Sequence, residues 1–450
     1  MPILIGLMLA IEMYCDVFQL EASIAPGLSV KNGMLYLLAA VIAFRIVASR
    51  NFRFELPRLQ SAFLLLIAYA IVTWLIAWKI IQYDNYPGID NGILLKGTLA
   101  DFYIFFIVCL YGITSVDEAI IALSALLLVC AGANLVTVSD TIGLTHLGLI
   151  DVRDDGRVEG ALGEANQYAA FLTLLIPLYA AAAYTTRTLW RLVWVGCTAL
   201  ALLAMLTTVS RGGFVGLLVA AFVGSYVFRR HIAIGRIAGW GGVLGVTADM
   251  IVLLAVSGTM RSLIADRIFN ESTHGNVSDG RGDIWANTLS LMLNHPITMI
   301  TGYGWRVYWS MPHTYSPHNT YMNYWFNLGI PGLGCLLVVL HTIWSTARSA
   351  AMRTTDSRVR YLLIGFCFGL LGICISIFFV ELYTPWPFVW ACSGIMMRLA
   401  LEAPAAARPV SDPMQAAPGP AVPAGVRDPF GWRGAPASHA AQRQTGNGAR

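Results

Sequence analysis

The chain has 450 residues, of which 57% are hydrophobic and only 12% are charged, and its mean hydropathy is +0.65. This composition excludes an ordinary soluble globular protein, because such proteins carry roughly 25% charged residues. The formal net charge of +4 is small and its basic residues are dispersed, so the charge does not indicate a nucleic-acid-binding protein. The sequence therefore predicts an integral membrane protein.

Apolar segments recur along almost the whole chain, each near the length that a membrane-spanning helix needs. About 20 apolar residues in a helix cross the roughly 30 Å hydrocarbon core of a bilayer. We expect an all-α polytopic membrane protein with about 12 transmembrane helices. The predicted segments are residues 3–20, 33–48, 60–80, 98–113, 118–137, 166–185, 190–208, 212–228, 235–257, 321–345, 361–381 and 385–401.

The last part of the chain differs in composition from the rest. Residues 402–450 are rich in Ala, Pro and Gly and contain few large apolar residues. Such a segment cannot bury a hydrophobic core. We therefore expect a transmembrane domain over residues 1–401, followed by a disordered cytoplasmic tail over 402–450.

Basic residues in the short loops predict the orientation of the helices. Short loops that are rich in Lys and Arg stay on the cytoplasmic side of the membrane. With these loops in the cytoplasm, the predicted helices place both chain ends there as well. The longest loop, residues 258–320, then lies on the opposite side. The arginines that set this orientation are Arg45, Arg50, Arg53, Arg58, Arg187, Arg191, Arg229, Arg230, Arg236, Arg348, Arg353, Arg358 and Arg360.

The long loop contains one segment with a helical pattern, DGRGDIWANTLSLMLNHP at residues 279–296. We expect an amphipathic helix with Asp283 as its N-cap, and with Pro296 just beyond its end. Trp285, Leu289 and Met292 would form its apolar stripe. Such a helix would lie flat on the membrane surface and cover a cavity.

Three ionisable residues fall on the non-cytoplasmic side of the predicted topology. Arg211 ends a tight turn between helices, Arg281 precedes the predicted amphipathic helix, and His318 precedes the apolar segment 321–345. A guanidinium at this depth is costly unless it is paired or faces a wet cavity, and a helix start favours an anion. His318 alone of the three exchanges a proton near neutral pH, so it is a candidate base. A snorkelling arginine, a solvated loop arginine and a helix-capping histidine remain alternatives.

Aromatic residues are concentrated at residues 302–315, GYGWRVYWSMPHTY. Tyr303, Trp305, Tyr308 and Trp309 would suit stacking against sugar rings, although an aromatic belt at the membrane interface explains them equally well. No metal or cofactor is expected. The outer histidines lack metal-ligand spacing, the acidic run at 151–160 is typical of a solvated loop, and the eight cysteines show no CxxC pattern.

Several of these segments together resemble the bacterial O-antigen ligase superfamily, which also contains O-antigen polymerases and protein O-oligosaccharyltransferases. The matching stretches lie between about residues 160 and 335. They are GEANQYAAFL at 163–172, TTVSRGGFVG at 207–216, the arginine of GRGDIW, TGYGW at 301–305 and PHNTYMNYWFNLGIPGLG at 317–334. The resemblance implies a C-type glycosyltransferase fold in the bacterial inner membrane, with residues 258–320 as a periplasmic loop.

The resemblance also implies an activity and its substrates. The donor would be a glycan on undecaprenyl pyrophosphate, and the acceptor a terminal sugar hydroxyl of lipid A-core, both presented by membrane lipid at the periplasmic face. Transfer would need no metal and would invert the anomeric carbon. His318 would be the catalytic base, and Arg211 and Arg281 would bind the pyrophosphate, with Arg261 or Arg267 as alternatives for the second arginine. Further candidates for substrate binding are Asn319, Tyr303 and Trp305.

Three other functions remain open at this level. One is a protein O-oligosaccharyltransferase, which is less favoured because the sequence shows no large soluble C-terminal domain for polypeptide recognition. A polymerase of the same superfamily would use a second lipid-linked repeat unit as its acceptor. A transporter of an anionic solute would use the intramembrane arginines as its site and His318 as a proton relay. The sequence shows no internal repeat of the kind that is common in transporters, which favours the glycosyltransferase.

Overall fold

The structure is a computed structural model that describes residues 1–20, 23–49, 54–145, 148–150, 158–232, 281–311 and 316–403. Contacts group Met1–Ala406 into one unit and Ala407–Arg450 into another, and only the first is described. The predicted helix at 235–257, the predicted tail at 402–450 from residue 404 onward, and Arg261 and Arg267 therefore lie outside the described residues.

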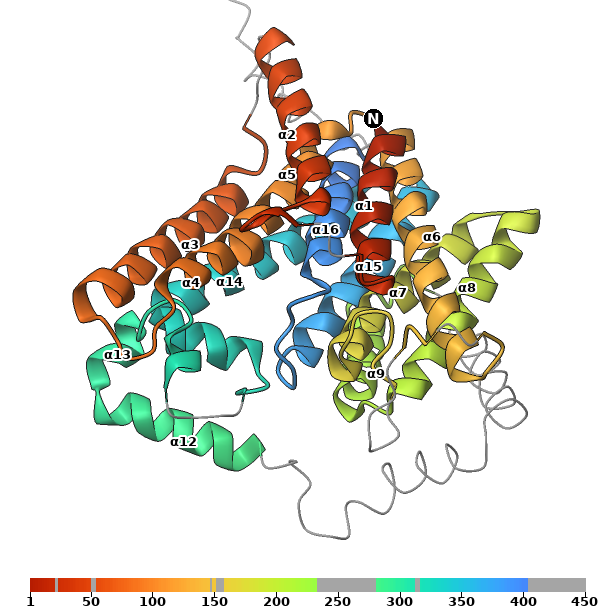
Figure 1. The fold of residues 1–450 in the computed structure, drawn as a ribbon. Coiled ribbons are helices and arrows are strands. Elements are labelled where there is room, and N and C mark those ends of the chain that lie inside the picture. The colour runs from red at the N-terminus through yellow and green to blue at the C-terminus, as the bar shows by residue number, and fades with distance from the viewer. Residues whose placement is uncertain are drawn as a thin grey trace, which may run out of the picture. The chain divides into compact units, whose positions relative to one another are not determined.

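Helices dominate the first half of the described unit (Figure 1). A small antiparallel hairpin of β1 (Ser23–Ala25) and β2 (Leu28–Ser29) is the exception to the all-α prediction in this half. The helical elements are α1 (Pro2–Val17), α2 (Val30–Ser49), α3 (Pro57–Leu75) with η1 (Ile76–Ile81), α4 (Gly88–Leu95) with η2 (Lys96–Ala100), α5 (Asp101–Gly112) and α6 (Val116–Thr141).

The second half is also helical in the part that the structure describes. Short elements precede the long helix α14 and form one side of the site described below. The elements are α7 (Ala165–Thr185), α8 (Thr188–Thr208), α9 (Arg211–Val227), α12 (Arg281–Asn294), α13 (Pro296–Thr301), η5 (Val307–Ser310), α14 (Thr320–Arg353), α15 (Ser357–Ser376) and α16 (Trp386–Glu402).

Each predicted membrane segment within the described residues coincides with helix, so the expectation of a helical polytopic membrane protein is confirmed. The count of about 12 is not, because eight helices of the described part are long and apolar enough to cross a membrane. The shorter α9 is apolar as well. The eight are Val30–Ser49, Pro57–Ile81, Gly88–Gly112, Val116–Thr141, Ala165–Thr185, Leu189–Thr208, Thr320–Arg353 and Ser357–Ser376.

Two predicted boundaries are wrong. The loop expected at residues 81–97 is largely helical, because Gly88 and Gly92 lack side chains and so allow α4 to pack against the indoles of Trp78 and Trp74. The segment expected to stay helical to residue 381 ends at Ser376. High hydropathy continues past this point, but the chain turns away to contact the start of α14.

The helices α7 and α15 pack against each other in the core. Glycines of α15 face α7 so closely that a Cβ on Gly365 would lie 2.6 Å from Cβ of Ala181, and one on Gly369 would lie 2.5 Å from the carbonyl oxygen of Leu174. Small residues allow such an approach because they leave the backbones free to touch. This packing fixes α15, and with it the segment that follows.

The helix α14 is kinked at Gly329, whose φ of 61° and ψ of −162° are not helical. Pro331 has no N–H to donate to the carbonyl of Asn327, four residues earlier. That carbonyl instead accepts the N–H of Gly304 at 2.9 Å, and the carbonyl of Phe326 accepts the N–H of Tyr303 at 2.9 Å. The kink therefore binds the loop at 302–304 through main-chain hydrogen bonds.

We expect Gly329→Ala to lower the free energy of unfolding by about 3 kcal/mol or more, because φ is positive and the new Cβ would lie 2.1 Å from the carbonyl oxygen of Ile300. The matched control is Gly334→Ala in the same helix, where a Cβ meets nothing within 4 Å. The control should melt within a few degrees of wild type. Thermal melting of both variants in detergent tests this, and equal melting temperatures would contradict the role of the kink.

Candidate functional site

The segment between α15 and α16, residues 377–385, is called here the α15–α16 connection. It binds the start of α14 through Thr320. The N–H of Thr320 donates to the carbonyls of Ile377 at 2.9 Å and Val380 at 3.2 Å, and its hydroxyl donates to the carbonyl of Val380 at 2.9 Å. His318, two residues before Thr320, is thereby held beside the connection.

The start of α9 contacts the same connection. A Cβ on Gly212 would lie 2.9 Å from Cβ of Phe379, so the two backbones are in close contact. The preceding turn is tight, with Val209 in the left-handed region at φ 48°. The hydroxyl of Ser210 donates to the side-chain oxygen of Asn166 at 2.9 Å, which ties this turn to α7. Arg211, the first residue of α9, therefore lies at the connection.

The helix α12 reaches the connection through Trp285. The indole N–H of Trp285 donates to the carbonyl of Pro317 at 2.7 Å, next to His318. Its ring also meets that of Phe378 edge-on, with 5.3 Å between centroids. Arg281 is the first residue of α12 and lies one turn before Trp285 on the same face.

Details of the α12 prediction need correction. The helix starts at Arg281, so Asp283 lies in its first turn and is not the N-cap. Leu289 is exposed, while Thr288 and Met292 are buried against the loop at 302–311, because the packed face follows positions 281, 285, 288 and 292. Pro296 lies beyond the end of α12 as expected and begins α13.

The first residues of α9, α12 and α14 thus meet at one connection, and these three helix starts carry Arg211, Arg281 and His318. Helix N-termini present free N–H groups and the positive end of the helix dipole. Two arginines at two such ends make this region suited to an anion. The structure brings together the segments that hold these three residues, although they are 70 and 37 residues apart in the sequence.

The backbone at His318 is strained. Its φ is 47°, in the left-handed region, and its N–H donates to the hydroxyl of Ser316 at 3.1 Å. Such a conformation costs a non-glycine residue about 1 kcal/mol or more, and residues of this kind cluster at functional sites. The turn that this conformation produces sets the direction in which the chain enters α14.

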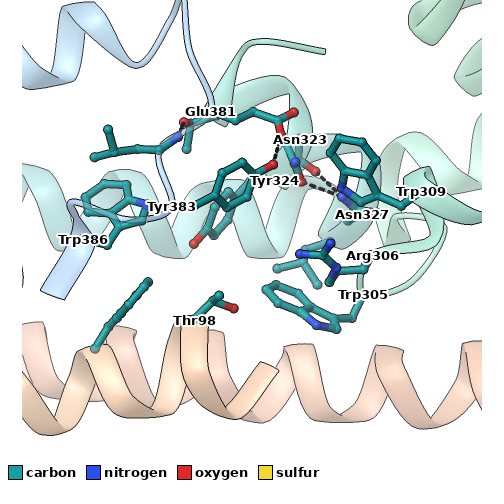
Figure 2. Close-up of a pocket in the computed structure, with 14 residues that line it drawn as sticks. Thr98, Trp305, Arg306, Trp309, Asn323, Tyr324, Asn327, Glu381, Tyr383 and Trp386 are labelled. Atoms are coloured by element: carbon teal, nitrogen blue, oxygen red, sulfur yellow. Dashed lines mark hydrogen bonds between the residues drawn. The ribbon is translucent and has the colours of Figure 1, made fainter. Parts of the chain in front are cut away.

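A pocket adjoins the start of α14 and the connection (Figure 2). It encloses about 540 Å³, counting the open solvent at its mouth. Thr320 belongs both to the wall of this pocket and to the connection. The other lining residues are Thr98, Phe102, Trp305, Arg306, Trp309, Asn323, Tyr324, Asn327, Leu328, Glu381, Leu382, Tyr383 and Trp386.

Arg306 and Glu381 carry the charges of this pocket. Arg306 has a left-handed φ of 58°, and its guanidinium lies 5.9 Å from the ring centre of Trp309. Figure 2 shows Arg306 beside Trp305 and Asn327, and Glu381 next to Asn323. The Glu381 carboxylate accepts a hydrogen bond from the hydroxyl of Tyr383. Burial raises the pKa of Glu381 to about 7, although the neighbouring Asn323, Ser316 and Arg306 act in the opposite direction.

Of the other three predicted site residues, Trp305 lies in the pocket, whereas Tyr303 and Asn319 have structural roles. Trp305 lines the pocket, and its indole N–H donates to the carbonyl of Asn91 at 3.1 Å. Tyr303 instead packs in a hydrophobic cluster, with its ring stacked on that of Phe326 at 4.4 Å between centroids and its hydroxyl donating to a main-chain carbonyl. Asn319 is buried as the N-cap of α14, where its side-chain oxygen accepts the N–H of Met322 at 3.0 Å.

Four polar residues of the pocket were not predicted from the sequence: Arg306, Asn323, Asn327 and Glu381. Arg306 lies in the run GYGWRVYW, whose aromatic residues alone were predicted to bind a ligand. Glu381 falls at the end of the predicted membrane segment 361–381. A single acidic residue in such an apolar segment is the pattern that could have indicated a functional role. Among the described residues no group of three or more His, Cys, Asp or Glu forms a metal-binding cluster.

These features define a multi-pass helical membrane protein in which cationic helix starts lie next to an aromatic pocket with one carboxylate. Comparison with known families agrees with this chemistry. Residues 196–337 match the family model described as O-antigen ligase, and this stretch contains Arg211, Arg281, Arg306 and His318. This part of the chain is therefore similar to the O-antigen ligase domain. No curated protein matches the chain.

We expect Glu381→Gln to change how stability depends on pH. Because the pKa of Glu381 is raised from 4.5 to about 7, the folded protein keeps a proton that the unfolded chain releases in this range. Wild type should therefore lose stability as pH rises from about 4.5 to 7, by on the order of 3 kcal/mol from this group. Glutamine cannot ionise, so the variant should lack this loss.

Melting temperatures of the purified protein between pH 5 and 7.5 measure the effect. The control is Asp117→Asn, which removes an exposed carboxylate in the first turn of α6 and should leave the pH profile as in wild type. Parallel profiles for wild type and Glu381→Gln would contradict the raised pKa.

Proposed function

We propose that this protein transfers O-antigen glycan from undecaprenyl pyrophosphate to a terminal sugar hydroxyl of lipid A-core. The observation that carries the proposal is the O-antigen ligase match over residues 196–337, which contains Arg211, Arg281 and His318. The meeting of the three helix starts at the α15–α16 connection supports it, because the reaction needs a base and a cationic site within reach of one substrate pair.

Arg211 and Arg281 bind the pyrophosphate of the donor in this proposal. The guanidinium is always charged and offers paired N–H donors that match phosphate oxygens. Both residues begin helices, so the main-chain N–H groups and the helix dipoles add to the same attraction. The charge that develops on the departing pyrophosphate is stabilised by these groups, without a metal ion.

His318 acts as the general base. Its imidazole accepts the proton of the acceptor hydroxyl while the hydroxyl oxygen bonds to the anomeric carbon of the donor sugar. The bond between that carbon and the pyrophosphate oxygen breaks, and the lipid pyrophosphate leaves. A well-placed base contributes about 10² to 10⁴ in rate. Attack from the face opposite to the leaving group inverts the anomeric configuration.

The lipid carriers fit a site at the membrane surface. Both substrates have lipid anchors, so they reach the site laterally in the bilayer, while their sugars lie in the aqueous space outside it. We place the site at the periplasmic face of the inner membrane, with both chain ends in the cytoplasm, on the basis of the arginine distribution between the helices. The helix α12 covers the start of α14 from this side.

The first experiment reconstitutes the purified protein in nanodiscs with undecaprenyl-pyrophosphate-linked glycan and a metal chelator, with and without lipid A-core that lacks O antigen. Glycan attached to lipid A-core supports a metal-independent ligase. Longer lipid-linked chains without attachment to the core would instead make the protein a polymerase. No transfer under any condition would contradict both, and a counterflow assay with glycolipids would then test transport.

We expect Arg211→Ala and Arg281→Ala to reduce kcat/KM for the donor at least about 100-fold, because each removes charge-assisted contacts to phosphate. His318→Ala should lower kcat by about 10² to 10⁴ and leave donor binding nearly unchanged. The control is Arg348→Ala, which removes an exposed arginine near the other end of α14. Steady-state kinetics measure these effects, and wild-type turnover by His318→Ala would exclude it as the base.

We also expect the new glycosidic linkage to have the anomeric configuration opposite to that of the donor. Direct displacement by the acceptor hydroxyl requires this result, whereas a covalent glycosyl-enzyme intermediate would give retention. Proton NMR of the isolated product distinguishes the two from the coupling constant at the anomeric position. A retained configuration would contradict the single-displacement mechanism and the role of His318 in it.

A further inference from the structure

We infer that the pocket that contains Arg306 and Glu381 is a subsite for one sugar ring with two adjacent free hydroxyl groups. This inference rests on the proposed function, in which both substrates carry glycans. The subsite is distinct from the helix starts that hold Arg211, Arg281 and His318, and its role is to select and orient a saccharide.

The first argument is that two buried polar atoms of the pocket have no hydrogen-bond partner among the described residues. They are Oε1 of Glu381 and Nε of Arg306. Buried polar groups are nearly always paired, and each unpaired one costs free energy. One atom is an acceptor and the other a donor. A hydroxyl group both donates and accepts, so a sugar with adjacent hydroxyls satisfies both.

The second argument comes from the aromatic walls. Trp305, Trp309 and Trp386 line the pocket together with Tyr324 and Tyr383. The C–H face of a sugar ring is apolar and weakly positive, so it packs against the negative face of an indole. The indole of Trp305 is held by its hydrogen bond to Asn91, whereas Trp309 is 42% exposed at the mouth of the pocket.

The polar side of the pocket is preorganised by a short network on α14. The side-chain N–H of Asn327 donates to the side-chain oxygen of Asn323 at 2.6 Å, one turn earlier. The side-chain oxygen of Asn327 accepts the N–H of Tyr308 at 3.1 Å, which fixes the loop that carries Arg306. Because these groups are already in place, binding a sugar would require little reordering.

The charges argue against other ligands for this pocket. A phosphate at Arg306 would also meet the carboxylate of Glu381, which repels an anion. A lipid chain would leave Nε of Arg306 and Oε1 of Glu381 without hydrogen-bond partners, which costs free energy. A neutral saccharide avoids both penalties, because its hydroxyls pair with either charge.

The position of the pocket indicates how the subsite serves the reaction. Thr320 lines the pocket and lies two residues after His318. A sugar bound here therefore lies next to the segment that carries the proposed base. The ring belongs either to the donor glycan or to the acceptor core, and the experiment below distinguishes these two sources.

The test measures saccharide binding by full-length protein in nanodiscs, using saturation-transfer NMR. The two probes are the lipid-free core oligosaccharide and the lipid-free O-antigen repeat unit. The variants are Glu381→Gln, which keeps the size of the side chain, and Trp309→Ala, which changes an exposed residue, so both should fold. Trp309→Phe is the conservative variant. The control is Trp190→Ala, which removes an indole that is 55% exposed on α8.

We expect Glu381→Gln and Trp309→Ala to weaken binding of one probe about tenfold or more, and Trp309→Phe to restore most of it. In the transfer assay the same variants should raise KM for the substrate that carries this ring more than they lower kcat. Weaker binding of the core oligosaccharide assigns the subsite to the acceptor, and weaker binding of the repeat unit assigns it to the donor.

Two outcomes separate this inference from the proposed function. If wild type transfers glycan but both variants bind the probes as wild type does, the subsite is excluded and the proposed function stands. If wild type transfers nothing, yet binds a saccharide in a way that depends on Glu381 and Trp309, the subsite stands and the proposed function fails.

Discussion

The hydrogen bonds between Thr320 and the α15–α16 connection are the contact on which the candidate site depends. They join the start of α14 to a segment that also touches the starts of α9 and α12. Without these bonds the start of α14 would no longer be fixed to the segment that the starts of α9 and α12 also touch. Main-chain carbonyls at the connection accept these bonds because α15 stops at Ser376, which leaves its following carbonyls without helical partners.

Much of the fold follows from hydropathy alone, because a bilayer requires long apolar helices whose backbone groups are paired internally. The three ionisable residues Arg211, Arg281 and His318 were also identifiable, since charge is rare in such a chain. Hydropathy could not locate the end of α15, because the residues after Ser376 remain apolar while the backbone leaves the helix. It could not identify Arg306 and Glu381 as neighbours either, since their proximity arises from the docking of the loop at 302–304 onto the kink at Gly329.

The candidate site divides into two regions with different electrostatic character. Around Arg211 and Arg281, guanidinium groups and helix N-termini all favour negative charge. In the pocket, the positive charge of Arg306 has the acidic Glu381 as a neighbour. Burial raises the pKa of Glu381 by more than the neighbouring groups lower it. The family match covers the first region and only part of the second, because Glu381 and Tyr383 lie beyond residue 337. The α15–α16 connection, which forms one wall of the pocket, therefore lies outside the matched residues.

The glycine contacts between α15 and α7 have a consequence for how the pocket is held in place. These two helices touch along their backbones, and Gln167 of α7 also accepts the N–H of Tyr383 at 2.7 Å in the connection. One wall of the pocket is thus joined to the closely packed pair of α7 and α15 by a main-chain N–H that donates to Gln167. The facing wall, which carries Arg306, is held by separate contacts: its loop donates main-chain N–H groups to the carbonyls of Phe326 and Asn327, and α12 packs on it through Thr288 and Met292. The two walls of the pocket are therefore held by different helices, so a substitution that loosens one wall leaves the contacts of the other in place.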